Sequence, residues 1–278
     1  MERDITPGDR VIILVSLILM GAVLASLTRF PTLGYEVNVL GSPLGLVLDG
    51  RWLLALLLVL LTAAGVDGLV RTEAGRQRAD VRYTATFWIL PCLITLAIAV
   101  TIPRQFGATG SWLISLALLG ALLTVVILAE YRTIQLAAPQ YRMARLALNL
   151  ATYCAAFALY GTIYGLQVRS LISAPLTMLV TFPLALELLR STEEQLDRTW
   201  LYAAVVTLVV GELTWAVNAW GLRALSGGGV LLLAFYTFAG LAQQHLAVRL
   251  NRRVAAEFLA TATIGLVLVW LSAPWLSR

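Results

Sequence analysis

Apolar runs of about 20 residues recur along the whole chain, separated by short segments that contain arginine. A run of this length crosses the hydrocarbon core of a bilayer as an α-helix. The pattern predicts an all-α, polytopic transmembrane helix bundle of about nine spans, forming a single transmembrane domain over residues 1–278. The expected spans lie near residues 11–29, 52–70, 84–102, 111–130, 143–168, 170–189, 200–222, 230–248 and 255–274. Pro91 and Pro183 interrupt the third and sixth spans, which leaves a kinked or half-inserted helix open for either.

The distribution of arginine predicts which way the chain crosses the membrane. All 20 basic residues are arginine, and the chain has no lysine. If the N-terminus lies inside, the inner segments hold fourteen arginines and the outer segments hold six, which together make the 20. Cytoplasmic loops of membrane proteins carry the excess of basic residues. We therefore expect a multi-pass protein of the bacterial cytoplasmic (inner) membrane, with its N-terminus inside and its C-terminus outside.

The composition excludes several kinds of chemistry. Without lysine, no Schiff base to retinal can form. With one histidine, the chain cannot build a site that needs two histidine ligands. Cys92 and Cys154 both fall inside apolar runs, which predicts small buried side chains and no disulfide framework. The net charge of +5 is explained by arginines in inner loops, so we expect membrane lipids as partners and no nucleic acid.

One connection on the predicted outer side is long. Residues 31–50 are too apolar for a solvated loop, and turn signals lie at Gly34, at Gly41-Ser42-Pro43 and at Asp49-Gly50. We expect this segment to lie along the outer interface as a short hairpin or cap. A packed structural cap is the simpler role, and a lid or a docking surface is the alternative.

The fifth predicted span is the most strongly patterned. Its aromatic residues recur at helical spacing on one face, and a parallel row of small residues runs beside them. The rings belong to Tyr153, Phe157, Tyr160 and Tyr164, and the small residues are Cys154, Ala158, Gly161 and Gly165. Small residues let a neighbouring helix approach closely, which predicts helix packing. The alternative is a slot for a bound lipid or a flat apolar ligand, such as a quinone, a carotenoid or a chlorophyll-type pigment.

A carboxylate and an amide lie within the seventh predicted span. Counting about 1.5 Å per residue from Trp200 puts Glu212 near the midplane, where a lipid-facing carboxylate costs roughly 2.5–3.5 kcal/mol. We therefore expect Glu212 to face the bundle interior, on the same side as Trp215, with Asn218 on a different side. Two roles remain open for Glu212: a protonated acid bonded to a hydroxyl group, or a carboxylate that carries protons or binds a cation. The hydroxyl groups within reach are those of Tyr160, Tyr164, Tyr236 and Thr237.

Polar residues also gather at the predicted inner ends of several spans. They are Asp67, Glu130, Asn149, Glu187, Gln243, Gln244, His245 and Glu257. If these helices converge, the residues form an inward-facing polar vestibule. If they do not, the acids pair at the interface with arginines such as Arg132, Arg190 and Arg253. His245 has two interpretations of its own: an axial ligand to a haem or a chlorophyll magnesium, or a hydrogen-bonding group at the interface.

One short motif resembles that of a known enzyme family. Glu193-Glu194-Gln195-Leu196-Asp197-Arg198 fits EExxxR, which resembles the first motif of the CAAX-type intramembrane proteases. The resemblance implies two further motifs with a histidine each, the first of them FxxxH, and an Asn or Asp that completes the site. This chain has one histidine, and Phe238 precedes it by seven positions instead of four. We identify no catalytic residues and no metal ligands.

In general character the chain resembles the accessory membrane proteins of bacterial photosynthetic and electron-transfer complexes, which are apolar, arginine-rich and poor in motifs. The resemblance implies a non-catalytic integral subunit that packs against other integral membrane subunits of a larger assembly and holds lipid, quinone or pigment. The alternative is a proton-coupled small-solute transporter that uses Glu212.

Overall fold

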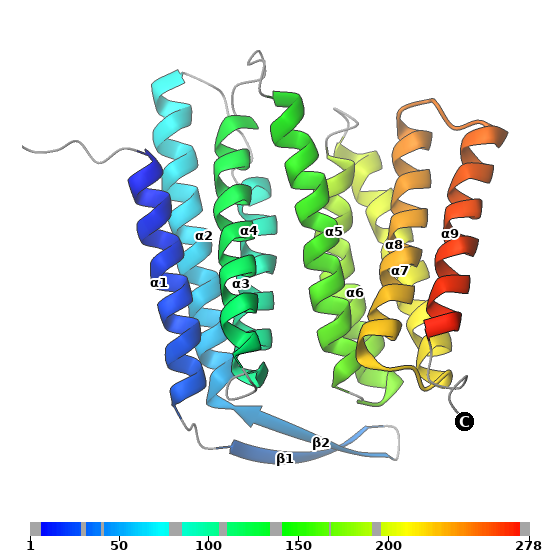
Figure 1. Ribbon diagram of the computed structural model, residues 1–278, viewed down its shortest axis with the longest axis horizontal. Helices are drawn as coiled ribbons and strands as arrows, with labels where there is room; N and C mark the ends of the chain where they lie inside the picture. Colours follow the sequence, from blue (N-terminus) through cyan, green and yellow to red (C-terminus); the bar gives the residue numbers. More distant parts are fainter. Residues whose placement is uncertain are drawn as a thin grey trace, which may run out of the picture. The chain divides into compact units, whose positions relative to one another are not determined.

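The computed structural model describes residues 7–28, 32–39, 42–77, 85–105, 110–133, 141–166, 168–190 and 196–272. The chain divides into two compact units, Met1–Ala147 and Leu148–Arg278, which we call the N-terminal unit and the C-terminal unit. Within each unit, consecutive helices run in opposite directions (Figure 1). Whether the two units form one transmembrane domain stays a prediction.

Nine α-helices and two β-strands form within the described residues. The helices are α1 Pro7–Leu27, α2 Gly50–Gln77, α3 Ala85–Gln105, α4 Ser111–Thr133, α5 Tyr141–Gly165, α6 Ser170–Leu189, α7 Leu196–Ala219, α8 Ala224–Leu246 and α9 Arg252–Ser272. All of them except α3 are long and apolar enough to cross a membrane, by length and composition, and α3 contributes the shorter apolar stretch Phe87–Ile102. The predicted helical membrane bundle is therefore confirmed.

The helix ends differ from the predicted spans where a helix continues beyond its apolar run. The second span was expected to end at residue 70, but α2 continues to Gln77. In the added part, Nε of Arg71 lies 2.7 Å from a carboxylate oxygen of Asp67, one helical turn earlier. A pair at this spacing supports helix outside the bilayer. Hydropathy marks the apolar part of a helix, and its polar extension is stabilised separately.

Proline does not interrupt either of the two helices in which it was expected to matter. α3 runs from Ala85 to Gln105 with Pro91 inside it, and α6 runs from Ser170 to Leu189 with Pro175 and Pro183 inside it. A proline in a membrane helix is tolerated when neighbouring helices and local hydroxyl groups satisfy the freed backbone groups. Both spans are continuous helices in this structure.

The connection between α1 and α2 forms a β-hairpin. A hairpin was one of the two forms predicted for this segment, the other being a cap. β1, Thr32–Val39, pairs antiparallel with β2, Ser42–Asp49, in a register that runs from Thr32 opposite Asp49 to Val39 opposite Ser42. The turn signal at Gly41 lies outside the described residues, between the two strands. The hairpin lies at the end of the N-terminal unit where α1 ends and α2 begins (Figure 1).

In the N-terminal unit, α1 packs against α2, α3 and α4. Glycine allows close approach here: a Cβ at Gly65 of α2 would lie 2.7 Å from the side chain of Leu14 in α1. α2 and α3 are also joined by one buried hydroxyl pair, with Thr62 Oγ1 2.9 Å from Thr95 Oγ1. Small residues and interhelical hydrogen bonds are the usual means by which membrane helices associate.

In the C-terminal unit, α5 and α8 lie in close contact at two glycines. A Cβ at Gly228 of α8 would lie 2.7 Å from both the Cα and the N of Gly161 in α5. The next turn of α5 continues the contact, since a Cβ at Gly165 would lie 3.2 Å from the Cβ of Ala224. The predicted row of small residues on α5 is thus a helix-packing surface at Gly161 and Gly165.

Candidate functional site

The two faces of α7 have different compositions, and this difference determines how the helix packs. The buried face consists of small, β-branched and aliphatic residues, namely Ala203, Val206, Val210, Gly211, Thr214 and Val217. The exposed face consists of Leu201, Val205, Leu208, Glu212, Trp215 and Ala219. α6 and α8 pack against this helix, and Gly211 lies directly against Met178 of α6.

Glu212 lies on the exposed face of α7, so the prediction that it faces the interior of the bundle is wrong for this structure. The predicted grouping by faces holds, because Glu212 and Trp215 share the exposed side while Thr214 and Leu222 are buried on the side of Asn218. The prediction considered only the free-energy cost of exposing the Glu212 carboxylate to lipid. Helix packing favours the face with small residues, because it brings more atoms into contact.

Asn218 joins α7 to α6 through two hydrogen bonds. Its Nδ2 donates to Ser170 Oγ at 3.0 Å and to Ser173 Oγ at 2.7 Å. Ser173 begins a buried row of hydroxyl groups at one-turn spacing on α6, which continues with Thr177 and Thr181. The two threonines donate to the carbonyls of Ser173 and Thr177, one turn earlier in each case. These polar groups satisfy one another inside the bundle.

Tyr160 and Tyr164 of α5 were predicted as possible partners of Glu212. In the structure they bond to neighbouring helices instead. Tyr160 is fully buried, and its hydroxyl lies 2.8 Å from Thr181 Oγ1 of α6. The Tyr164 hydroxyl donates to the carbonyl of Val217 at 3.1 Å and accepts from the N–H of Leu222 at 3.0 Å. Tyr164 therefore satisfies backbone groups where α7 ends and the chain turns towards α8.

The remaining members of the predicted ring face on α5 are less enclosed. Tyr153 is half-buried and contacts the rings of Phe235 and Tyr236 of α8, at centroid distances of 5.9 and 5.7 Å. Phe157 is exposed. Cys154 is also exposed, which corrects the expectation that both cysteines are buried; Cys92 is buried as expected. Ala158 is half-buried between these positions.

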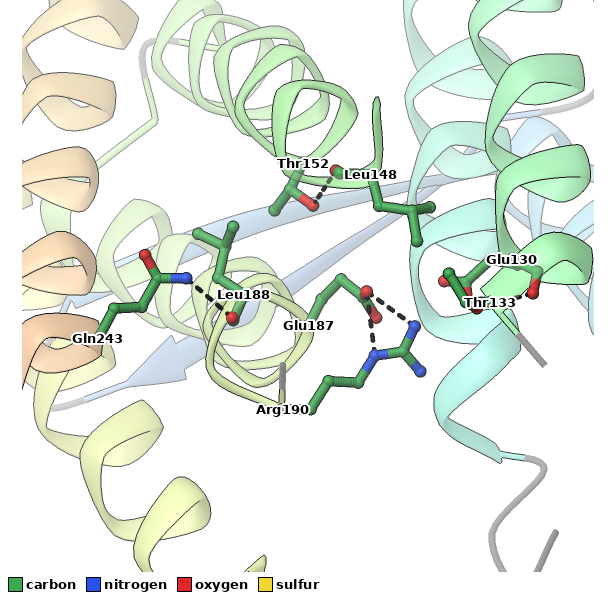
Figure 2. A network of polar contacts seen from close by, with 8 residues as sticks. All are labelled: Glu130, Thr133, Leu148, Thr152, Glu187, Leu188, Arg190 and Gln243. Atoms are coloured by element: carbon green, nitrogen blue, oxygen red, sulfur yellow. Dashed lines mark hydrogen bonds and ion pairs between the residues drawn. The ribbon is translucent and has the colours of Figure 1, made fainter. Parts of the chain in front are cut away.

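Several acids at the predicted inner ends form local ion pairs with arginines. This pairing was one of the two alternatives predicted for them. Besides Asp67 with Arg71, Glu187 accepts from Nη2 and Nε of Arg190 at 2.9 and 3.0 Å, and Glu257 lies 3.6 Å from Nε of Arg253. Figure 2 shows the guanidinium of Arg190 folded back onto the carboxylate of Glu187.

The other amide and carboxyl groups of the predicted inner ends lie on separate helices. Gln243 Nε2 of α8 donates to the carbonyl of Leu188 in α6 at 2.9 Å (Figure 2). Asn149 is half-buried on α5, and Glu130 is buried on α4. Glu193 and Glu194, the acids of the motif similar to that of the intramembrane proteases, lie outside the described residues.

His245 is exposed near the end of α8, and its ring packs against Tyr202 of α7 with the centroids 5.5 Å apart. The two side chains line a groove of about 470 Å³ together with Arg198, Leu201, Leu246 and Val248. Of these residues, His245 was predicted from the sequence as a candidate ligand, Arg198 was noted only within the EExxxR motif, and Tyr202 was not noted. The one-turn spacing of Arg198 and Tyr202 places them on the same face of α7 and was the available signal.

Residues 30–272 match a family model described as "Protein of unknown function (DUF5656)". No curated protein and no solved structure matched the chain.

Proposed function

We propose that this chain, which belongs to the DUF5656 family, is a non-catalytic integral membrane subunit that binds other membrane-spanning subunits through the exposed face of α7. One observation carries the proposal: Glu212 is exposed on a helix that is apolar enough to span a membrane. A carboxylate near the midplane that faces lipid costs roughly 2.5–3.5 kcal/mol. A partner helix that offers an arginine, a hydroxyl or an amide at the same depth removes that cost.

The neighbours of Glu212 fit this role. Leu208 and Trp215 lie one turn before and after it, and both are exposed. Trp215 adds a large, rigid side chain with one hydrogen-bond donor, which is a common type of anchor in protein interfaces. Within the C-terminal unit, the hydroxyl groups of Tyr160 and Tyr164 already bond to α6 and to the end of α7. We therefore place the partner of Glu212 on another subunit.

The finer part of the proposal concerns the assembly. We propose a bacterial photosynthetic or electron-transfer complex of the inner membrane, on the strength of the general resemblance given above. The alternative of a proton-coupled transporter requires Glu212 on an interior path, so we do not propose it for a chain in which Glu212 is exposed.

Crosslinking from α7 tests the proposed interface. With a photo-crosslinking amino acid in place of Trp215, the full-length chain in its native membrane is expected to form one discrete product with a partner subunit. Adding Glu212→Leu is expected to lower its yield about fivefold, since interhelical polar contacts in membranes are worth about 0.6–1.7 kcal/mol. The measurement is the amount of product on a denaturing gel, with the partner identified by mass spectrometry.

The matched control carries the same crosslinker at Ile264, an exposed position on the membrane-spanning part of α9. Its products are expected to be unaffected by Glu212→Leu. If Trp215 and Ile264 both yield only lipid adducts, or if Glu212→Leu leaves the Trp215 product unchanged, the proposed interface does not exist.

We also propose that the N-terminus lies inside, in agreement with the arginine distribution. In a chain with Cys92 and Cys154 replaced by alanine, a cysteine in place of Arg223 is expected to react with a membrane-impermeant maleimide added to intact cells. Cysteines in place of Thr72 or Asn251 are expected to react only after the cells are permeabilised. All three residues are exposed in the structure. The opposite labelling pattern would reverse the orientation.

A further inference from the structure

Aromatic rings from three helices of the C-terminal unit meet at its surface. Tyr153 of α5 and Tyr236 of α8 lie with their ring centroids 5.7 Å apart, and both residues are half-buried. Phe258 of α9 is also half-buried, with its ring centroid 5.5 Å from that of Tyr236 and its ring directly against Gly240. We call the partly exposed rings of Tyr153, Tyr236 and Phe258 the aromatic surface.

The two tyrosines lie at the centres of their spans. Tyr153 is the middle residue of the candidate span Tyr141–Gly165, and Tyr236 is close to the middle of Ala224–Leu246. The hydrocarbon core of a bilayer is about 30 Å thick, so a residue at the centre of a span lies about 15 Å from either edge. A tyrosine side chain is shorter than that distance. Neither water nor a phospholipid headgroup therefore reaches these hydroxyl groups.

The polar atoms at the aromatic surface have no partner in the part of the chain that the structure describes. The hydroxyl groups of Tyr153 and Tyr236 form no hydrogen bond there, whereas those of Tyr160 and Tyr164 on α5 both do. The amide of Asn149, which is half-buried one turn before Tyr153, forms none either. A polar group without a partner in hydrocarbon costs free energy. These three side chains thus offer O–H and N–H donors to a molecule within the membrane.

The donors and the rings together select one class of ligand. The ester and phosphate oxygens of a phospholipid lie outside the hydrocarbon core, and a hydrocarbon carotenoid has no acceptor for an O–H group. A chlorophyll-type pigment needs an axial ligand, and His245 lies at the end of α8, away from Tyr236. A partner helix packs best on small residues, whereas the exposed neighbours Leu150 and Phe157 on α5 are large. A flat ring with carbonyl groups fits both the depth and the donors.

We propose that the aromatic surface binds the ring of a membrane quinone, to whose carbonyl oxygens Tyr153 and Tyr236 donate hydrogen bonds. Asn149 is a further donor one turn away. The aromatic side chains pack against the quinone ring in offset or edge-to-face contact, and its apolar tail lies along the exposed side chains of Leu150 and Phe157. The inference does not depend on the proposed interface at Glu212, because that interface uses the exposed face of α7.

Photoaffinity labelling of the full-length chain in lipid nanodiscs tests the site. The label is a trace of an azido derivative of decylubiquinone, and the competitors are decylubiquinone and decylbenzene, which has the same tail but no carbonyl group. The label is expected to map to peptides of α5 and α8, and decylubiquinone alone is expected to displace it. Tyr153→Phe and Tyr236→Phe are each expected to lower the affinity for decylubiquinone about fivefold, the usual net contribution of one hydrogen bond.

The matched binding control is Tyr202→Phe. It removes the same hydroxyl group from a tyrosine of α7 whose ring packs against His245, and it is expected to leave the affinity unchanged. Equal displacement by decylbenzene would mean that the surface binds apolar molecules without selecting carbonyl groups. That result would overturn the proposal, and so would an unchanged affinity in both Tyr153→Phe and Tyr236→Phe.

Two further measurements separate a ligand site from a packing surface. Without quinone, Tyr153→Phe and Tyr236→Phe are expected to keep the wild-type unfolding midpoint, whereas Tyr160→Phe is expected to lower it by removing the bond to Thr181. A lowered midpoint in both of the first two variants would mean that their hydroxyl groups stabilise the fold, which contradicts the proposal. With a photo-crosslinking amino acid at Phe157 in the native membrane, a crosslink to protein, within the chain or outside it, that decylubiquinone does not diminish would assign this surface to helix packing.

Discussion

Replacing Gly228 with alanine is expected to destabilise the C-terminal unit by about 1–3 kcal/mol, the usual cost of an added methyl group that forces a backbone shift. A Cβ at this position would lie 2.7 Å from the Cα and N of Gly161 and 3.3 Å from the carbonyl carbon of Tyr160. All three are backbone atoms of α5, so no side-chain rotation relieves the clash. The helices must separate, and the contact between Tyr160 and Phe235 must then loosen, where the ring centroids lie 6.1 Å apart.

The measurement is the midpoint of unfolding in mixed detergent micelles, followed by tryptophan fluorescence. Gly161→Ala is the matched control, because its Cβ would point elsewhere and lie 4.0 Å from the nearest atom, the carbonyl oxygen of Ala224. Alanine is also the better helix former, by about 0.8–1.0 kcal/mol. The control is therefore expected to be neutral or stabilising. Equal destabilisation by both substitutions would contradict the packing of α8 on α5 described here.

This pair of substitutions also shows what a packing motif in the sequence can predict. The spacing of Gly161 and Gly165 indicated a helix contact, and the contact exists. The residue with no room for a side chain, however, is Gly228 in the other helix, within the sequence Ser226-Gly227-Gly228-Gly229. A motif on one helix predicts close approach. Which glycine is required depends on the crossing angle and the offset of the two helices. Neither quantity can be read from the sequence of one helix alone.

The number of helices was predictable because each apolar run indicates a membrane-spanning helix independently of the rest of the chain. Length and hydropathy are local properties, and the bilayer imposes the same thickness on every span. The hairpin at residues 32–49 was predictable for a similar reason, since turn residues occur between β1 and the start of β2 at Gly41-Ser42-Pro43 and at the end of β2 at Asp49-Gly50. The turn signal at Gly34 was misleading, because Gly34 pairs with Val47 inside the ladder. The end of α2 was not predicted, because the pairing of Asp67 with Arg71 extends the helix after hydropathy has fallen.

The direction in which α7 faces was not predictable from Glu212 alone. The sequence separated the face of Glu212 from that of Asn218 correctly, because both follow from helical spacing. Choosing the buried face required a comparison of all residues on each side. The side with Val206, Val210 and Thr214 packs on α6 and α8, and Asn218 finds two hydroxyl partners there.

Replacing Arg190 is expected to have the second large effect on stability. Arg190→Leu is expected to destabilise the C-terminal unit by about 3–5 kcal/mol, because it removes the guanidinium that pairs with the buried carboxylate of Glu187. Glu187 is 1% exposed and Arg190 is 14% exposed, so little solvent is available to replace the lost interaction. The measurement is the same unfolding midpoint that is used for Gly228→Ala.

A double substitution separates the loss of the pair from the loss of Arg190 alone. Glu187→Leu combined with Arg190→Leu removes both charges and is expected to recover most of the stability, because apolar residues replace a buried ion pair at little cost. Arg71→Leu is the matched control. Its pair with Asp67 has side-chain exposures of 69% and 27%, and exposed pairs contribute at most about 1 kcal/mol. If the double variant is no more stable than Arg190→Leu, the two residues do not act as a pair, and Arg190 stabilises the end of α6 in another way.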